Sequence, residues 1–385
     1  MKIVCSDNMP YAREAFSRIG DPVVFEGRRI TAEDVKDAEI LAIRSTTKVD
    51  RRLLEGSRVR FVGTATIGTD HMDIPYLEAN GIKWCYAPGC NASSVSEYMT
   101  AALLYLAERY GLKLSGLTLG VIGVGNVGSL VVKKAEVLGM GVIQNDPPKR
   151  DLTGDDLFRP LDELLTQSDI VTVHVPLTRE GPYPTFHLAN RDFFSKLNPG
   201  AIFINAARGE VMETEALLQA MGSGQVSHAV IDTWEEEPVF HVPLLDAADI
   251  GTPHIAGHSF EGKVCGTVMV YREACRFLGV PATWLPEGIL PEPIVPEVSV
   301  DASSHRDELV LREVVKQVYD IERDDADLRA GWNGDEEARS AHFDRLRRDY
   351  PVRREFRFTR VKVLNGSSRL IERFSRLGFQ TEVTL

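Results

Sequence analysis

Three charged residues, Arg208, Glu237 and His254, have the side-chain types needed to move a hydride from a secondary alcohol to a nicotinamide. A histidine can take the hydroxyl proton near neutral pH. A carboxylate can orient the imidazole and favour its protonated form in the reverse reaction. A guanidinium can hold a substrate carboxylate and the developing oxyanion with its paired N–H groups. The three residues supply one group each, which predicts an oxidoreductase.

The same three residues follow expected strands or come shortly after them. Arg208 follows an apolar strand at 201–205, Glu237 follows one at 228–232, and His254 stands in the run Thr-Pro-His-Ile-Ala-Gly-His. The spacing of His254 and His258 could suit a metal on a helix. However, a proline and a glycine interrupt that helix and the sequence offers no third ligand, so no metal site is predicted.

A glycine pattern in the middle of the chain predicts dinucleotide binding. An apolar strand at 117–122 runs into Gly123-x-Gly125-x-x-Gly128, and a helix at 129–138 follows. These glycines permit a tight turn, a close approach to a pyrophosphate and close packing of helix on sheet, and the helix N-terminus favours the phosphates. After a second strand at 142–145 comes Asp146, which can bind the adenosine ribose diol and would repel the 2′-phosphate of NADP. NAD is therefore the predicted cofactor.

The segments that must position these groups alternate strands with helices. In residues 1–95, strands are expected at 3–5, 23–25, 40–43, 59–62 and 82–85, and a long capped helix at 95–109 leads into the glycine strand. Such alternation is typical of a parallel sheet covered on both faces, where ligands collect at the carboxyl ends of strands. The hydroxyl groups after the third and fourth strands, Ser45 and Thr66, lie at such ends.

A proline-rich stretch at 281–296 reads as an extended linker to a third, smaller domain. From about residue 300 the sequence predicts two charged helices, a strand at 355–364, a helix at 368–377 and a last strand at 379–384. Fewer than about 100 residues make only a marginal core alone, and symmetric dimers are the commonest remedy. The expectation is a homodimer.

Composition narrows the class of protein further. The formal net charge of −12 argues against a general binder of nucleic acid or membrane surfaces. The five cysteines are scattered without a CxxC pair, the first expected strand starts at residue 2, and no apolar run approaches the ~20 residues of a membrane helix. A cytoplasmic location is expected.

The motifs jointly resemble the D-isomer-specific 2-hydroxyacid dehydrogenase family. The resemblance rests on the glycine fingerprint and on the runs at 161–171, 205–209, 232–238 and 253–257. It implies a Rossmann-type doubly wound NAD-binding domain (96–254), a discontinuous flavodoxin-like α/β substrate domain (1–95 and 255–285) and a small α+β C-terminal dimerisation domain (286–385). It also gives Arg208, Glu237 and His254 the catalytic roles.

Further runs at 1–10, 44–49, 65–71, 87–91 and 257–263 resemble the branch of the family that acts on a small phosphorylated 2-hydroxy acid in pyridoxal 5′-phosphate synthesis. The implied substrate contacts are Ser45, Thr66 and His258, the last at a position where tyrosine is frequent. Val175 stands where a cofactor-contacting threonine is common in the family, so it is not included among the expected cofactor contacts. The expected cofactor contacts are Gly123, Gly125, Asn126, Val127, Gly128, Asp146, Ala206, Ala207, Arg208, Asp232 and Gly257.

Two alternatives stay open at this point. One is 3-phosphoglycerate dehydrogenase, whose regulatory module would read βαββαβ, whereas this tail reads roughly ααβαβ. The other is a dinucleotide-sensing corepressor built on the same fold, which would show no rapid NADH production with any small phosphorylated hydroxy acid.

Overall fold

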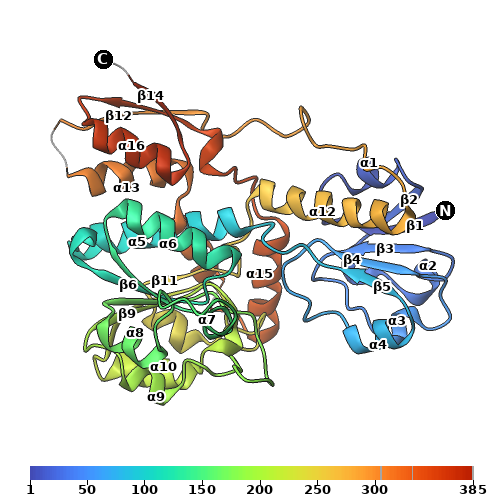
Figure 1. Ribbon diagram of the computed structural model, residues 1–385, viewed down its shortest axis with the longest axis horizontal. Helices are drawn as coiled ribbons and strands as arrows, with labels where there is room; N and C mark the ends of the chain where they lie inside the picture. The colour runs from blue at the N-terminus through green and yellow to red at the C-terminus, as the bar shows by residue number, and fades with distance from the viewer. Residues whose placement is uncertain (304–305, 332, 384–385) are drawn as a thin grey trace. The chain divides into compact units, whose positions relative to one another are not determined.

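The structure is a computed structural model that describes residues 1–303, 306–331 and 333–383. It divides into two compact units, residues 1–92 with 258–292 and residues 93–257 with 293–385. The first unit holds one parallel sheet, and the second holds two (Figure 1).

The first unit is a five-stranded parallel sheet in the order β2-β1-β3-β4-β5, which is the flavodoxin-like order. Its strands are β1 Lys2–Ser6, β2 Asp21–Phe25, β3 Ile40–Ile43, β4 Phe61–Thr64 and β5 Lys83–Cys85, and its helices are α1 Ala12–Phe16, α2 Ala32–Val35, α3 Arg51–Leu54, α4 Ile74–Ala79 and α12 Phe260–Leu278. All four residues of β3 are fully buried because helices cover both faces of the sheet. Helix α12 packs so closely on β4 that a Cβ at Gly63 would lie 2.3 Å from Val270. Residues 258–292, the segment that returns after the second unit, therefore complete the first unit.

The second unit carries the glycine turn in a six-stranded parallel sheet ordered β11-β10-β9-β8-β6-β7. Its strands are β6 Thr118–Ile122, β7 Gly141–Asn145, β8 Ile170–Val173, β9 Ala201–Asn205, β10 Val226–Ile231 and β11 Ile250–Gly251, and its helices are α5 Ala92–Tyr110, α6 Asn126–Leu138, α7 Pro147–Thr153, α8 Leu161–Gln167, α9 Arg191–Ser195, α10 Thr214–Gly222 and α11 Val242–Ala247. Phe158 adds an isolated parallel bridge to Gln144 of β7, where the doubly wound order 3-2-1-4-5-6 has its third strand. The sheet is Rossmann-type, and its order reverses between β6 and β8, beside the glycine turn.

The chain after residue 292 forms a three-stranded parallel sheet, β12-β13-β14, with helices packed on it. Its elements are β12 Glu297–Asp301, α13 Asp307–Val318, α14 Ile321–Arg329, α15 Glu336–Arg348, β13 Arg360–Leu364, α16 Ser368–Leu377 and β14 Gln380–Val383. The expected order ααβαβ is wrong at its start, because β12 precedes the helices and there are three helices before β13. The last expected strand extends to residue 384, which lies outside the described residues.

The C-terminal sheet and helices pack on the nucleotide-binding part of the same chain (Figure 1). Helix α16 contacts α6, and apolar side chains of α5, α6, α13 and α16 belong to one buried core. Arg373 of α16 donates to the carbonyl oxygens of Val137 and Leu138 at 2.9 Å each, at the C-terminus of α6. The apolar positions after residue 292 therefore find their partner surface within the chain, and the reason first given for a dimer is wrong.

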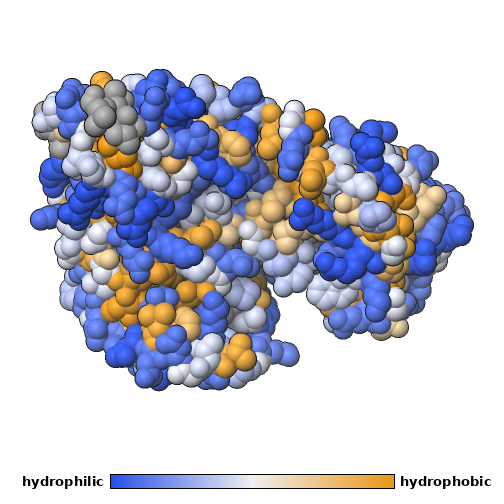
Figure 2. Space-filling model, turned by 45° about the horizontal axis from the view of Figure 1, so that its top comes forward, coloured by the Kyte–Doolittle hydropathy of each residue, from blue (hydrophilic) through white to orange (hydrophobic). Residues whose placement is uncertain are grey.

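The surface in view is largely hydrophilic and carries separate apolar patches (Figure 2). Large apolar side chains that stay exposed occur in both units, among them Leu152, Ile289 and Ile294. Within the described ranges, no helix is both long enough and apolar enough to cross a membrane.

Candidate active site

The glycine turn between β6 and α6 has the geometry of a pyrophosphate cradle. Gly123 has φ +83°, and a Cβ there would lie 2.6 Å from the carbonyl oxygen of His174. A Cβ at Gly128 would lie 2.0 Å from the carbonyl oxygen of Gly123, so only glycine lets the helix approach the strand this closely. Gly125 is exposed, and a Cβ there would meet no atom within 4 Å. The turn is thus closed on its protein side and open on the side where a phosphate would lie.

Helix α6 contributes the electrostatic attraction for a phosphate at this turn. It begins at Asn126 with Gly125 as N-cap, and no side chain caps its first N–H groups. These groups, from Asn126 and Val127 onward, carry the positive end of a 13-residue helix. The residues present therefore fit NAD, and they would hold its diphosphate.

Asp146 lies at the end of β7 and is tied to the glycine turn. One carboxylate oxygen accepts the N–H of Val124 at 2.9 Å, and the other accepts the N–H of Lys149 at 3.1 Å as the N-cap of α7. Each oxygen has a second lone pair, so the carboxylate can also accept from a ribose hydroxyl. The two backbone N–H groups hold the Asp146 carboxylate in one position.

We expect Asp146→Asn to narrow the preference for NAD over NADP, which should be about 100-fold or more in the parent enzyme on the scale of one buried charge repulsion. Asparagine keeps an acceptor oxygen but removes the charge that repels a 2′-phosphate. The measurement is kcat/KM with each cofactor. Asp169→Asn is the matched control, because Asp169 accepts the N–H of Thr118 at the other end of β6. An unchanged ratio in Asp146→Asn would contradict the assigned role.

Glu237 and His254 form a close pair in the second unit. The distance between His254 Nδ1 and Glu237 Oε1 is 2.5 Å. Burial raises the pKa of Glu237, but the charge of His254, this hydrogen bond, the charge of Arg347 and the N–H of Trp234 together outweigh burial and leave the pKa below its usual value. Glu237 therefore stays ionised. With Nδ1–H engaged by the carboxylate, Nε2 of His254 is the nitrogen that can face a substrate.

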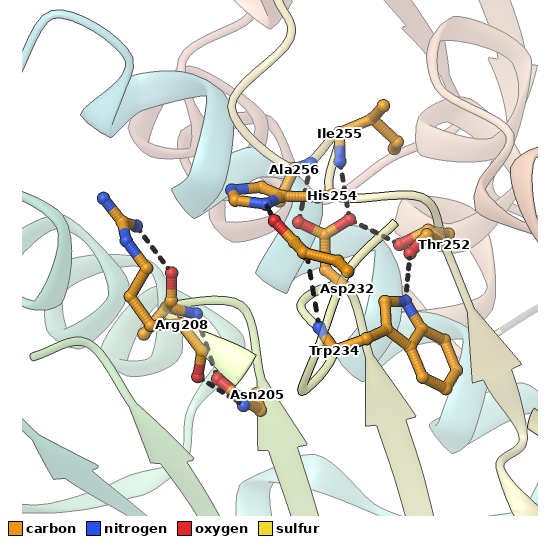
Figure 3. A network of polar contacts seen from close by, with 10 residues as sticks. Asn205, Arg208, Asp232, Trp234, Thr252, His254, Ile255 and Ala256 are labelled. Carbon is orange, nitrogen blue, oxygen red and sulfur yellow. Dashed lines mark hydrogen bonds and ion pairs between the residues drawn. The ribbon is translucent and has the colours of Figure 1, made fainter. Parts of the chain in front are cut away.

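His254 is held by a network of polar contacts around Asp232 (Figure 3). Its backbone has φ +54°, an uncommon conformation that histidine and asparagine adopt more readily than most residues. The N–H groups of Ile255 and Ala256 donate to Asp232 at 2.8 and 3.0 Å, and the Thr252 hydroxyl donates to it at 2.6 Å. Burial raises the pKa of Asp232 above its usual value, and the charge of His254 and these hydrogen bonds only partly offset that rise. Asp232 was expected only as a cofactor contact, but it also shapes the loop that carries His254.

Arg208 follows β9 in a loop held by hydrogen bonds between its side chains and its backbone. Asn205 accepts the N–H of Ala207 at 3.1 Å and donates to the carbonyl of Arg208 at 3.0 Å. The Arg208 Nη1 donates to the carbonyl of Ala207 at 2.7 Å. In Figure 3 the His254 ring points toward the side on which the guanidinium lies. The three residues expected to be catalytic thus occupy neighbouring loops at one edge of the sheet.

Gly209 allows the Arg208 loop to approach the 232–237 loop. A Cβ at Gly209 would lie 1.8 Å from the carbonyl oxygen of Trp234. We expect Gly209→Ala to lower the free energy of unfolding by about 1–3 kcal/mol and to reduce activity by displacing Arg208. Thermal unfolding of Gly222→Ala is the control, since a Cβ at that end of α10 meets nothing within 4 Å. Equal stability of the two variants would contradict the close approach.

The expected substrate contacts belong to the first unit. Ser45 is exposed after β3, and Thr66 follows the neighbouring strand β4. The Thr66 hydroxyl contacts the Thr64 hydroxyl at 2.7 Å and donates to the carbonyl of Gly68 at 2.9 Å. His258 opens the returning segment before α12, while Gly257 and Ala206 lie in the second unit. The structure thus places Ser45 and Thr66 at adjacent strand ends.

Comparisons with known proteins show the family of the chain and related folds. The family described as D-isomer specific 2-hydroxyacid dehydrogenase, NAD binding domain matches residues 91–256, and a domain family of unknown function matches residues 289–378. Two solved structures are similar in fold. A D-lactate dehydrogenase from Aquifex aeolicus complexed with NAD and lactic acid has a TM-score of 0.61 and 26% identity, covering 72% of this chain and 95% of that one. An NAD-bound 3-phosphoglycerate dehydrogenase from Entamoeba histolytica has a TM-score of 0.64 and 25% identity, with the same coverage of 72% and 95%.

Curated relatives match over the whole length. Erythronate-4-phosphate dehydrogenase of Edwardsiella ictaluri is 45% identical over 383 residues, covering 100% of both chains. The protein of the same name from Azotobacter vinelandii is 44% identical over 378 residues, covering 98% of this chain and 99% of its own. The cradle, the Glu237–His254 pair and these matches identify an NAD-dependent dehydrogenase. The chain belongs to the erythronate-4-phosphate dehydrogenase family, a branch of the D-isomer specific 2-hydroxyacid dehydrogenases.

Proposed function

We propose that this enzyme oxidises the C2 hydroxyl of 4-phospho-D-erythronate, giving 2-oxo-3-hydroxy-4-phosphobutanoate in pyridoxal 5′-phosphate synthesis. The observation that carries the chemistry is the 2.5 Å contact between His254 and Glu237, in loops adjoining that of Arg208. The substrate follows from the names of relatives that match along the whole chain. Bound NAD supplies the hydride acceptor.

The roles of the chain's own residues follow from their contacts. His254 takes the hydroxyl proton at Nε2 while C2 loses its hydride and the C2–O double bond forms. Glu237 stabilises the resulting imidazolium through Nδ1–H. Arg208 binds the substrate carboxylate and the C2 oxygen. Ser45, Thr66 and His258 are proposed to bind the rest of the substrate, including its phosphate, from residues 1–92 and 258–292.

A substrate panel with NAD tests this proposal. Initial rates of NADH formation are compared for 4-phospho-D-erythronate, 3-phosphoglycerate and unphosphorylated erythronate. We expect kcat/KM for the first to exceed the others by about 100-fold or more, since a site built for a polar group rejects an analogue that lacks it. Equal or faster turnover of 3-phosphoglycerate would overturn the assignment. The corepressor alternative is set aside, because the chain is a dehydrogenase.

The enzyme is also proposed to act in the cytoplasm as a homodimer joined through its C-terminal domain, residues 286–385. The five cysteines are free thiols, which fits a reducing compartment. Ile294, Val352 and Leu364 remain exposed on the C-terminal part, the first by 78%, and a second copy could cover them. Sedimentation at micromolar concentration should give the mass of two chains. A single-chain mass would contradict the dimer.

A further inference from the structure

Arg353 joins the C-terminal part of the chain to the loop that carries His254. It lies between α15 and β13 and is only 6% exposed. Its Nη2 donates to the carbonyl oxygen of Ala256 at 2.8 Å and also contacts the hydroxyl of Ser94. The Ser94 hydroxyl donates to the same carbonyl at 2.8 Å. Two buried donors, separated by more than 250 residues in sequence, therefore meet on one backbone oxygen.

The carbonyl of Ala256 matters because the N–H of the same residue makes one of the hydrogen bonds that hold the His254 loop. That N–H donates to Asp232 at 3.0 Å, next to the N–H of Ile255 at 2.8 Å. Asp232 thus binds the N–H of Ala256, and Arg353 with Ser94 binds the carbonyl oxygen of the same residue. His254, two residues earlier, has a left-handed backbone with φ +54°, a conformation that persists only where the surrounding structure supports it.

We infer that Arg353 is a positioning residue for the oxidation: its hydrogen bond to Ala256 fixes the 252–257 loop so that His254 meets Glu237. This inference rests on the proposed function and adds to it a residue outside the nucleotide-binding part. We assign Arg353 no contact with the cofactor or the reacting atoms. It acts through the loop.

The surroundings of Arg353 keep its guanidinium in one place. Its Cζ lies 4.1 Å from the centre of the Tyr319 ring, a favourable cation–π distance. Glu97 of α5 accepts the N–H of Phe356 at 2.9 Å, which anchors the segment that follows Arg353. Burial lowers the pKa of Arg353, but the nearby phenols and carboxylates of Tyr350, Tyr319, Glu97 and Asp324 outweigh it. The side chain is therefore a fixed, charged donor.

Arg312 provides a matched control from the same C-terminal part. It is 1% exposed and pairs with Glu108 of α5 at 2.9 Å, so it too joins a C-terminal helix to α5. None of its hydrogen bonds or ion pairs in the described residues reaches the 252–257 loop. Its loss tests the structural cost of removing a buried arginine without moving His254.

The experiment compares Arg353→Gln, Arg353→Lys, Ser94→Ala and Arg312→Gln with the parent enzyme, using 4-phospho-D-erythronate and NAD. Each variant is measured for kcat, KM, melting temperature and the pH profile of kcat/KM. We expect Arg353→Gln to lower kcat about tenfold or more, because small misplacements of a catalytic group are costly. The acid side of its pH profile should move as the His254–Glu237 contact loosens. Arg353→Lys should restore part of kcat.

Arg312→Gln should lower the melting temperature while kcat and the pH profile stay within about twofold of the parent, on the scale of a substitution away from the site. If Arg353→Gln does not fold, Ser94→Ala carries the test, with a smaller loss of kcat in the same direction. An unchanged kcat and pH profile in Ser94→Ala and in any folded Arg353 variant would overturn the inference. Inactivity of the parent enzyme on this substrate would instead refute the proposed function, before any variant is compared.

Discussion

Replacing His254 is expected to lower kcat by about 10²–10⁴, the usual contribution of a positioned general base. The contact of Nδ1 with Glu237 leaves Nε2 of His254 free to take the substrate proton. His254→Asn is the sharper variant than His254→Ala, because asparagine tolerates φ near +54° better than alanine does. Steady-state rates and NADH binding measured by fluorescence separate the catalytic loss from a loss of cofactor.

His187→Ala is the matched control for this prediction. His187 Nε2 lies 2.7 Å from Glu235 Oε1, so it is another histidine paired with a glutamate of the same loop. Its removal should leave kcat within a few-fold of the parent, as for a residue outside the chemistry. Glu237→Gln should cost less than the loss of His254 and should move the pH profile, because the imidazole loses its ionised partner. Near-normal turnover in His254→Asn would refute the assigned base.

Replacing Arg208 is expected to reduce kcat/KM by about 10²–10³, the scale found for removing one group that stabilises an oxyanion. Arg208→Lys keeps the charge but loses the two-pronged geometry that matches a carboxylate, so it should recover little of the loss. NADH binding should change much less than turnover. Arg191→Ala is the control, because Arg191 is exposed on α9 and donates only to Gln219 in the hydrogen bonds described. Equal effects of the two substitutions would contradict the role of Arg208.

The parts of the fold that follow from local sequence signals could be predicted. The glycine turn depends on a strand, three glycines and a helix within about twenty residues. In the structure a side chain would clash at Gly123 and Gly128, whereas the space at Gly125 is open. The types of Arg208, Glu237 and His254 suggested their chemistry. Their closeness could not be derived from spacing alone, since it depends on adjacent parallel strands and on the approach at Gly209.

Other features had no local signal. Strand β12 reads Glu-Val-Ser-Val-Asp, with only Val298 and Val300 buried, and it directly follows a proline-rich stretch, so its sequence pattern does not predict a strand. Arg353 is one of several arginines between residues 345 and 360, and no local pattern distinguishes it. Its partner Ala256 lies 97 residues earlier, and only the folded chain brings the two together. Long-range contacts of this kind are what single-sequence patterns leave out.

The transfer of a labelled hydrogen tests the central claim most directly. The enzyme is incubated with NAD and 4-phospho-D-erythronate that carries deuterium at C2, and the NADH is examined by mass spectrometry and NMR. Direct hydride transfer predicts one deuterium atom on the nicotinamide ring for each product molecule, whichever step limits the rate. Unlabelled NADH with deuterium released to water, or no NADH at all, would contradict the account.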